Sequence, residues 1–300
     1  MTIGRLSAAF VTDVGLRRRN NQDAALAEDG VVLVCDGMGG GVAGERASAS
    51  AVERMRALAS LDSRRRADIE RALVAAQHEV LALGRSLGGV AGTTVSGVVL
   101  AGGEVTTREG RVLSAEHLAY VLNVGDSRTY HMDPMPDGSG WDAGSLIRIT
   151  RDHSQRQEMI DSGELLPDMA RELVPRNVIT QCVGAPEGIA PDLFLADATG
   201  RFIVCSDGLH AELGDDERIA RVAAACDDPR EAAHALVRAA LEAGGSDNVT
   251  VAVADMPVAF PARHAWSVTK LDDGEDIGNI ADGTLETLRT IHQGGHDGRL

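Results

Sequence analysis

The sequence has few aromatic residues, few cysteines and no long apolar run, and each scarcity argues against a class of protein. Aromatic residues make up 3% of the 300 residues, so the core must be built from Val, Leu, Ile and Ala. The four cysteines form no Cys-x-x-Cys pair, which gives a zinc site little support and suits a reducing compartment. No stretch approaches the ~20 apolar residues of a membrane helix, and the N-terminus lacks the pattern of a signal peptide. We therefore expect a cytoplasmic protein.

Basic residues are also in the minority. The chain carries 29 Lys and Arg against 45 Asp and Glu, which gives a formal net charge of -16. Because nucleic acids and anionic membranes bind basic surfaces, we expect neither as a partner. The surplus carboxylates either form a solvated surface that keeps the protein soluble or gather around cations. Total charge alone favours the solvated surface.

Short apolar runs come in groups, with longer helical patterns between the groups, rather than in strict alternation with helices. Runs of strand length cover residues 31–35, 93–100, 118–124, 146–150, 201–205 and 248–254. Helical spacing covers residues 42–60, 67–84, 154–162 and 229–243. This grouping predicts an α+β fold in which helices cover packed antiparallel sheets, rather than a doubly wound parallel sheet.

Three further segments interrupt the pattern. Residues 101–116 and 133–144 are typical of hairpin loops, and residues 151–190 are typical of an inserted lid. The apolar rhythm stops after Val253, where an acidic, glycine-containing stretch begins. We expect one domain over residues 1–256 and a flexible acidic tail over residues 257–300, which either recruits a partner or is dispensable.

Four aspartates stand at the ends of apolar runs. Asp36 and Asp207 each follow a run and precede a glycine, Asp126 follows the run that ends at Val124, and Asp247 precedes the last run. A single aspartate of this kind is an ordinary turn residue, but strand ends can bring several to one spot. Clustered carboxylates repel one another and require a cation or a shared proton. Oxygen ligands without His or Cys favour Mg²⁺ or Mn²⁺ over Zn²⁺.

The motifs around these aspartates resemble those of the metal-dependent protein phosphatases of the PP2C (PPM) family, in their compact bacterial form. The matching segments, in chain order, are Thr12-Asp13-Val14-Gly15 with Arg18, Asn20 and Asp23; Asp36-Gly37-Met38-Gly39-Gly40; Gly92-Thr93-Thr94; Gly125-Asp126-Ser127-Arg128; Asp152-His153-Ser154; Arg176-Asn177-Val178-Ile179-Thr180; Ser206-Asp207-Gly208; and Gly245-Ser246-Asp247-Asn248-Val249-Thr250. They span residues 10 to 254, and their order and spacing together make the resemblance specific.

The resemblance implies a fold and a set of roles. The fold would be a central antiparallel β-sandwich flanked by helices on both sides, in four αββα layers. Asp36 would bridge two metal ions with help from the carbonyl of Gly37, and Asp207 and Asp247 would hold the second ion. Asp126 and Asp207 would hold a third, weaker ion. Asp23 and Gln22 would support the ligands from behind, and Arg18 would bind the substrate phosphate.

The chemistry of phosphate esters supports these roles independently. A phosphate monoester dianion resists attack, and two cations ~3.5–4 Å apart can clamp its oxygens and acidify a water that attacks phosphorus. The planar fork of an arginine suits the phosphate. The sequence lacks a Cys-x5-Arg loop, which argues against a cysteine phosphatase.

Several residues allow another interpretation. Asp126 could be a structural partner of Arg128, and Arg18 is one of three consecutive arginines that could form a solvated patch. His153 could be a general acid, although a structural hydrogen bond is the commoner role of a loop histidine.

The chain also departs from the family pattern at two places. Gln22 stands where the family usually has Glu, which predicts weaker metal binding at most, with activity retained. The segment Gln181-Cys182-Val183-Gly184 replaces Arg-Ala-Leu-Gly beside the expected lid, which predicts an altered substrate preference.

The predicted function is metal-dependent hydrolysis of phosphoserine and phosphothreonine in proteins. The expected cofactors are two Mn²⁺ or Mg²⁺ ions, with a third as an additional expectation. The expected partners are phosphoproteins, either targets of a serine/threonine kinase or the kinase itself. Two alternatives stay open at this point: a two-metal hydrolase of small phosphate esters, and a pseudo-phosphatase that binds phosphoproteins without turnover.

Overall fold

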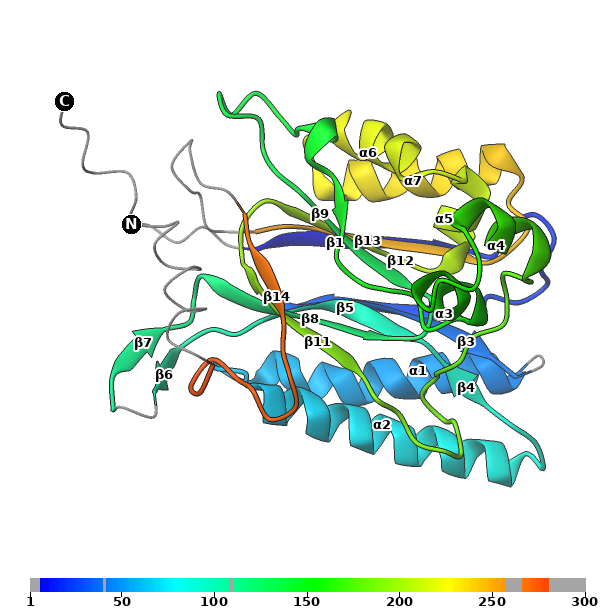
Figure 1. Cartoon of the computed structure of the whole chain (residues 1–300), viewed down its shortest axis with the longest axis horizontal. Helices are drawn as coiled ribbons and strands as arrows, with labels where there is room; N and C mark the ends of the chain where they lie inside the picture. Colours follow the sequence, from blue (N-terminus) through cyan, green and yellow to red (C-terminus); the bar gives the residue numbers. More distant parts are fainter. Residues whose placement is uncertain (1–5, 40–41, 108–109, 257–265, 281–300) are drawn as a thin grey trace.

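Two antiparallel sheets lie face to face, with helices on both outer sides (Figure 1). The computed structural model describes residues 6–39, 42–107, 110–256 and 266–280. The five-stranded sheet contains, in spatial order, β1 (Ser7–Asp13), β13 (Val249–Asp255), β12 (Arg201–Cys205), β9 (Arg128–Met132) and β10 (Ile147–Arg148). The predicted four-layer α+β fold is confirmed.

The second sheet has seven strands. Its order is β14 (Val268–Lys270), β11 (Asp192–Asp197), β8 (Leu118–Val124), β5 (Val95–Leu100), β3 (Val31–Met38) and β2 (Asp23–Glu28), with β4 (Gly92–Thr93) paired to β3. The central strand β8 is buried at every position, which explains its nearly continuous apolar sequence. A separate hairpin of β6 (Glu104–Thr106) and β7 (Val112–Ser114) lies within the segment predicted as a hairpin loop.

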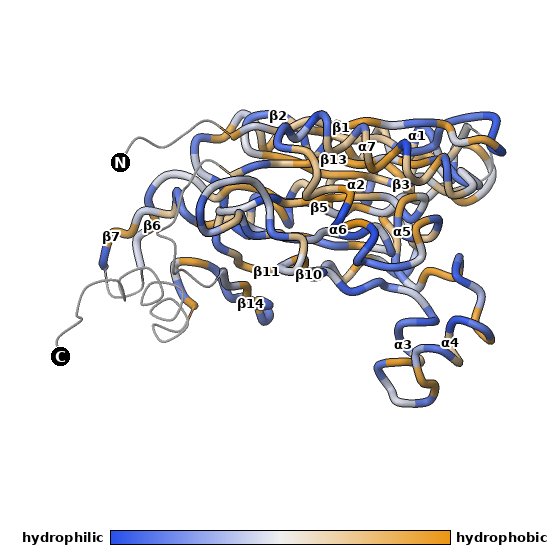
Figure 2. Tube along the Cα trace, turned by 90° about the horizontal axis from the view of Figure 1, so that it is seen from above, coloured by the Kyte–Doolittle hydropathy of each residue, from blue (hydrophilic) through white to orange (hydrophobic). Residues whose placement is uncertain are grey.

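The helices cover the outer faces of the two sheets. The seven-stranded sheet is covered by α1 (Val42–Arg56), which continues into a 3₁₀ turn (Ala57–Ser60), and by α2 (Arg66–Ser86). The five-stranded sheet is covered by α5 (Asp207–Leu213), α6 (Asp216–Ala224) and α7 (Pro229–Ala243). A second 3₁₀ turn (Ala143–Ser145) precedes β10. Two short helices, α3 (Gln155–Asp161) and α4 (Pro167–Leu173), project away from the layers (Figure 2).

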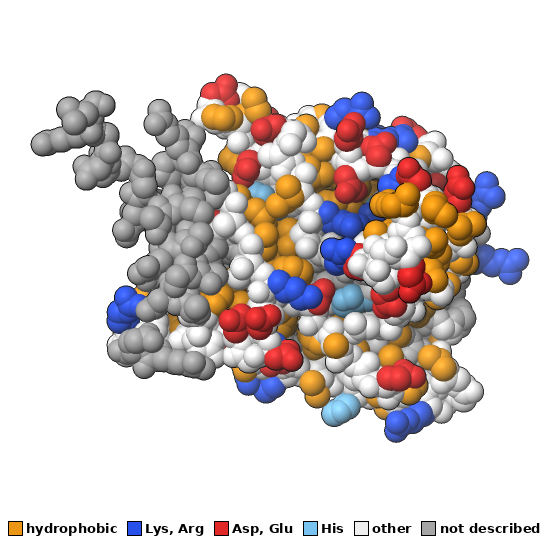
Figure 3. All heavy atoms as spheres, viewed as in Figure 1, with side chains coloured by type: hydrophobic (Ala, Val, Ile, Leu, Met, Phe, Trp, Pro, Cys, Tyr) orange, Lys and Arg blue, Asp and Glu red, His pale blue; other side chains and the backbone are white. Residues whose placement is uncertain are grey.

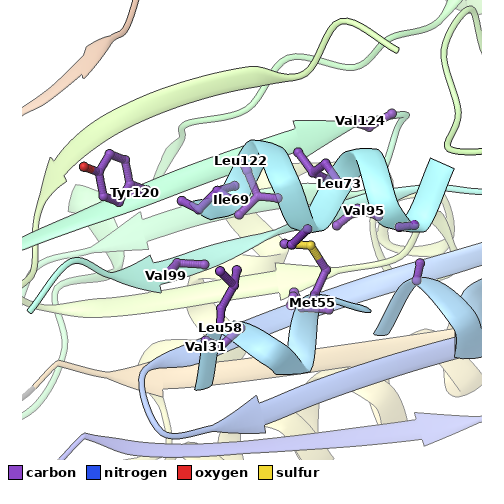
Figure 4. Close-up of a cluster of buried hydrophobic side chains, with 14 of the residues drawn as sticks. Val31, Met55, Leu58, Ile69, Leu73, Val95, Val99, Tyr120, Leu122 and Val124 are labelled. Atoms are coloured by element: carbon purple, nitrogen blue, oxygen red, sulfur yellow. The ribbon is translucent and has the colours of Figure 1, made fainter. Parts of the chain in front are cut away.

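The core divides into three apolar layers that follow this stacking. Figure 4 shows the layer under α1 and α2, where Met55, Ile69 and Leu73 face strand residues such as Val99 and Leu122. A second layer joins α5, α6 and α7 to their sheet, and a third fills the space between the two sheets. These layers hold the strand ends in fixed positions, which is what a site built from strand ends requires.

Residues 266–280 were expected to belong to a flexible tail, but in the structure they pack against the domain. Strand β14 forms the edge of the seven-stranded sheet and pairs with β11, and Leu271, Ile277 and Ile280 are buried against the core under α2. The apolar positions are sparse, so the polar composition of the segment hid their spacing. The rest of the predicted tail, residues 257–265 and 281–300, lies outside the described residues. No helix in the described part of the chain is long and apolar enough to cross a membrane.

Candidate active site

Asp23 and Asp36 lie directly opposite each other in the hairpin formed by β2 and β3. Residues that face each other across an antiparallel pair have neighbouring side chains on one face of the sheet. Asp36 belongs to β3 itself rather than to the turn after it, so its position is fixed by the strand pairing. The hairpin thus brings together two carboxylates that are thirteen positions apart in sequence.

The other predicted aspartates reach the same region from different elements. Asp207 is the first residue of α5, directly after β12, and it is hydrogen-bonded to Asp36. Asp126 lies in the turn between β8 and β9, and Asp247 lies two residues before β13. The charges of Asp207, Asp126 and Asp247 all act on Asp36, which places the four carboxyl groups in one electrostatic neighbourhood. The structure therefore gathers the residues that the sequence singled out.

Glycines make this convergence possible. A Cβ atom on Gly37 would lie 2.1 Å from the carbonyl oxygen of Gly44 and 2.6 Å from that of Gln22. One on Gly208 would lie 2.0 Å from the carbonyl oxygen of Asn248. Real Cβ atoms do not approach backbone oxygen this closely, so the backbones beside Asp36 and Asp207 pack at distances that only glycine permits.

Asn248 ties the loop that carries Arg18 to β13. Its side-chain amide donates hydrogen bonds to the carbonyls of Val14 and Asn20, both at 2.9 Å, and its side-chain oxygen accepts one from the amide of Gln22 at 2.8 Å. The loop is therefore held by a buried side chain at three points along its length. This anchoring places the arginine beside the aspartates.

Arg18 is the arginine of its triplet that reaches the carboxylates. One guanidinium nitrogen donates to Oδ2 of Asp247 at 2.6 Å, while 53% of the Arg18 side chain stays exposed. The hydrogen bond with Asp247 is the main reason why the pKa of Arg18 is raised. The charges of Asp207 and Asp36 raise it further. The guanidinium therefore has solvent on one side and the acidic cluster on the other.

Burial and mutual repulsion raise the pKa values of four of these carboxyl groups. Burial, followed by repulsion from Asp207 and other neighbours, raises the pKa of Asp126 to about 8. Burial also raises the pKa of Asp23 to about 7, against hydrogen bonds from Thr250 and Ser206. The same two causes, burial first and neighbouring carboxylates second, raise the pKa values of Asp36 and Asp207. Such a cluster is stabilised by any positive charge placed inside it.

The alternative interpretation, in which Asp126 is the structural partner of Arg128, does not match the contacts of Arg128. Arg128 forms two hydrogen bonds with Asp152 instead, at 2.8 and 2.6 Å. His153 has a structural hydrogen bond, because its Nδ1 accepts from the amide of Gly125 at 3.2 Å. Among the charged neighbours of Asp126, Asp207 has the largest effect on its carboxyl group.

Other polar side chains complete the site without having been assigned a role from the sequence. Ser206 donates to Oδ2 of Asp23 at 2.8 Å, and Thr94 accepts from the amide of Asp36 at 2.9 Å. Arg176 donates a hydrogen bond to Oγ of Ser246 at 3.4 Å, and its charge acts on Asp207. All of them belong to the motifs quoted above, so motif membership was the available signal.

The donor set fits hard divalent cations. It consists of carboxylate oxygens and backbone carbonyls, and one buried carboxylate oxygen, Oδ1 of Asp23, has no hydrogen-bond partner. In the arrangement that the structure has, no three His, Cys, Asp or Glu side chains of the described residues already form a closed metal cage.

Comparisons with known proteins agree with this picture. No protein-family model matches the chain. The chain is 31% identical over 263 residues to the serine/threonine protein phosphatase PstP of Mycobacterium tuberculosis, which covers 84% of this chain and 45% of the relative. It therefore spans about half the length of that relative.

Two solved structures extend the comparison. The PPM Ser-Thr phosphatase MsPP of Mycobacterium smegmatis, in complex with cacodylate, superimposes with a TM-score of 0.68 and 34% identity, over 83% of this chain and 98% of that one. The catalytic domain of PstP in complex with two manganese ions gives a TM-score of 0.68 and 29% identity, over 84% and 99%.

A four-layer αββα fold with aspartates gathered at its strand ends defines the class of metal-dependent phosphatases. The likeness to MsPP, which extends over nearly all of that chain, places this protein within the class. The chain belongs to the PPM (PP2C-type) family of serine/threonine phosphatases.

Proposed function

We propose that this protein hydrolyses phosphoserine and phosphothreonine in proteins by a metal-dependent reaction. The observation that carries the proposal is the convergence of Asp36, Asp126, Asp207 and Asp247 beside the half-exposed guanidinium of Arg18. Carboxylates bind divalent cations, and a guanidinium binds a phosphate dianion. Family membership supports the same activity, and the relatives are named as serine/threonine phosphatases.

The proposed ligands are the residues expected from the sequence. Asp36 and the carbonyl of Gly37 would hold one ion, with Asp36 shared by a second ion at Asp207 and Asp247. Asp126 and Asp207 would hold a third, weaker ion. Mn²⁺ is the first choice of metal because the catalytic domain of PstP is described with two manganese ions, and Mg²⁺ is the alternative.

Bound cations would supply the positive charge that neutralises the phosphate and lowers the pKa of an attacking water. The protein's own groups then have three tasks. Asp126 loses its proton to become a ligand, and its raised pKa of about 8 makes this loss dependent on the cation. Arg18 exchanges its carboxylate partner Asp247 for a phosphate oxygen, for which its exposed face leaves room. Ser206 keeps Asp23 oriented through its hydrogen bond.

Gln22 would make ion binding weaker than a glutamate would. A Cβ atom on Gly44 would lie 2.6 Å from Nε2 of Gln22, so the amide packs closely against the start of α1, next to the carbonyl of Gly37. A neutral amide near this carbonyl adds no charge to the ion's surroundings. An unchanged Mn²⁺ affinity in Gln22→Glu, measured by calorimetry, would remove this part of the proposal.

The proposed substrate is a phosphoprotein rather than a small ester. The projecting segment of α3 and α4 is joined at its base by hydrogen bonds from Gln155 to the carbonyl of Val178 and from Thr180 to that of His153. Acidic, basic and apolar side chains mix on the face that carries it (Figure 3), and Leu166 and Leu173 are largely exposed there. Such a surface suits a peptide chain better than a nucleotide.

Hydrolysis of a phosphothreonine peptide and of a nucleotide monophosphate, both with Mn²⁺, separates the candidate functions. A much higher kcat/KM for the peptide supports the protein phosphatase. A preference for the nucleotide favours the small-ester hydrolase, and peptide binding without phosphate release by metal-loaded protein favours the pseudo-phosphatase. We further propose that the substrates are targets of a serine/threonine kinase, or the kinase itself, and that the protein acts in the cytoplasm.

A further inference from the structure

The sequence contains one lysine, Lys270, and the structure places it next to the carboxylate of Asp192. Lys270 lies on β14, the edge strand that pairs with β11. Its Nζ lies 2.7 Å from Oδ1 of Asp192, the first residue of β11. The other 28 of the 29 Lys and Arg residues are arginines, so Lys270 carries the one primary amine among the side chains.

Asp192 connects Lys270 to His153. Its second oxygen, Oδ2, lies 3.4 Å from Nε2 of His153, and the side chains of Asp192 and His153 are only 16% and 11% exposed. Burial acts to raise the pKa of Asp192, but hydrogen bonds from His153 and Lys270 outweigh it and lower the pKa. Asp192 is therefore a carboxylate held between two donors.

His153 in turn holds the turn before Asp126. Its Nδ1 accepts from the amide of Gly125 at 3.2 Å, and its own amide donates to the carbonyl of Gly125 at 2.9 Å. Because Nδ1 accepts a hydrogen bond, the neutral ring carries its proton on Nε2, which faces Asp192. The ring is thus oriented by the carboxylate on one side and fixes the Gly125 backbone on the other.

The opposite side of the same turn is attached to Asp36. Thr94 and Ser127 share a hydrogen bond of 2.6 Å between their hydroxyls, and Thr94 also accepts from the amide of Asp36. Gly125 adopts a φ of +104°, and a Cβ there would lie 2.5 Å from Cγ2 of Thr94. The turn that presents Asp126 is therefore held between the Asp36 strand and the His153 ring.

We propose that Lys270, Asp192 and His153 form a chain of positioning residues through which the C-terminal strand β14 sets the orientation of Asp126 and the affinity of its cation. This inference rests on the proposed function, because it concerns an ion at Asp126. Residues that orient ligands from behind commonly change metal affinity by ~10–100-fold when they are substituted. Lys270 acts at the exposed end of the chain, where ion pairs are weak, so its removal changes affinity by about two- to fivefold.

Two measurements on the full chain test the proposal. The first is amide hydrogen exchange of Gly125, followed by NMR in metal-free protein. The second is Mn²⁺ titration followed by electron paramagnetic resonance, which counts free ions and separates strong from weak sites. The variants are Lys270→Met, Asp192→Asn and the charge-conserving Lys270→Arg. Arg54→Met is the matched control, because Arg54 is also a half-exposed basic residue paired with an acid, Glu79, between α1 and α2.

The proposal predicts that Lys270→Met and Asp192→Asn speed exchange at Gly125 and weaken the weakest Mn²⁺ site, by about two- to fivefold and about tenfold respectively. Lys270→Arg and Arg54→Met should behave like the wild type. Wild-type exchange and affinity in Lys270→Met would overturn the proposal, as would faster exchange throughout the sheet, which would indicate a merely structural role. A wild type that takes up no Mn²⁺ would refute the proposed function, and the metal-free exchange measurement would still decide whether the chain positions the turn.

Discussion

Arg18 and Asp247 are 229 residues apart in the sequence and are joined by a hydrogen bond of 2.6 Å. The bond places a cationic group against a proposed metal ligand, with half of the arginine still exposed. In the proposed reaction, Arg18 exchanges this carboxylate contact for a contact with the phosphate. The acidic cluster therefore holds the guanidinium that we propose to bind the phosphate.

Removing the guanidinium tests this arrangement. Arg18→Ala should lower kcat/KM for a phosphothreonine peptide by about two orders of magnitude, because a charge-assisted contact to the developing phosphate charge is lost. Arg18→Lys should recover only part of the activity, since an ammonium lacks the planar fork. Steady-state kinetics give the values, and Arg17→Ala is the control from the same triplet. Equal losses in the two alanine variants would contradict a specific role for Arg18.

The stability of the metal-free protein should fall as the pH rises. An unfolded aspartate ionises near its ordinary pKa of 3.8, whereas Asp126 in the folded protein ionises near a pKa of about 8. The folded protein binds more protons between these values, so the contribution of Asp126 is present at low pH and is lost as the pH rises towards 8. Asp23, with a pKa of about 7, acts in the same direction.

Thermal unfolding in the presence of a chelator, from pH 5 to pH 8, measures this slope. Asp126→Asn should flatten it, and saturating Mn²⁺ should reverse it, because cation binding favours the ionised carboxylates. A metal-free Tm that rises steadily over this range would show that the aspartates do not repel one another as described.

The glycine beside Asp36 should tolerate no side chain. Gly37→Ala would force a methyl group to within 2.1 Å of the carbonyl oxygen of Gly44, so β3 and the start of α1 would have to separate. We expect a loss of ~1–3 kcal/mol or more in the free energy of unfolding, together with weaker metal binding. Urea denaturation measures the first and calorimetry the second. Gly89→Ala is the matched control, since a Cβ there meets no atom within 4 Å, and it should leave both quantities unchanged.

The C-terminal segment should be part of the stable domain. Truncation after residue 256 removes β14 and the buried side chains of Leu271, Ile277 and Ile280. At ~1.5–3 kcal/mol for each buried aliphatic side chain, the loss amounts to several kcal/mol. Truncation after residue 280 retains these contacts and should leave Tm near that of the full chain. Equal Tm values for the two truncations would contradict this prediction and would indicate that residues 257–300 are dispensable for stability.

The strand-end aspartates made the site predictable from the sequence. Strands β8 and β12 and helix α7 have the predicted residue ranges, because their apolar patterns are long and continuous. The positions of the aspartates at the ends of these strands then follow from their adjacency in the sequence. The family resemblance added the order of the motifs and, with it, Arg18.

Other elements could not be predicted because their structure depends on distant partners. Strand β2 has the sequence Asp-Ala-Ala-Leu-Ala-Glu, whose residues have low intrinsic strand propensity, and it is a strand because it pairs with β3. Asp23 and Asp36 lie opposite each other only because of the register in which β2 pairs with β3. The path from Lys270 to Gly125 depends on β14 pairing with β11, which no local pattern in the polar C-terminal segment indicates.

Hydrolysis of a phosphothreonine peptide by the wild type and by Asp207→Asn, with and without Mn²⁺, tests the central claim most directly. Asp207 is hydrogen-bonded to Asp36 and lies in the field of both Arg18 and Arg176, so a neutral amide there keeps the shape and removes a proposed ligand charge. We expect phosphate release that requires Mn²⁺ in the wild type and falls by at least about a hundredfold in the variant. Metal-independent release, or full activity in Asp207→Asn, would contradict it.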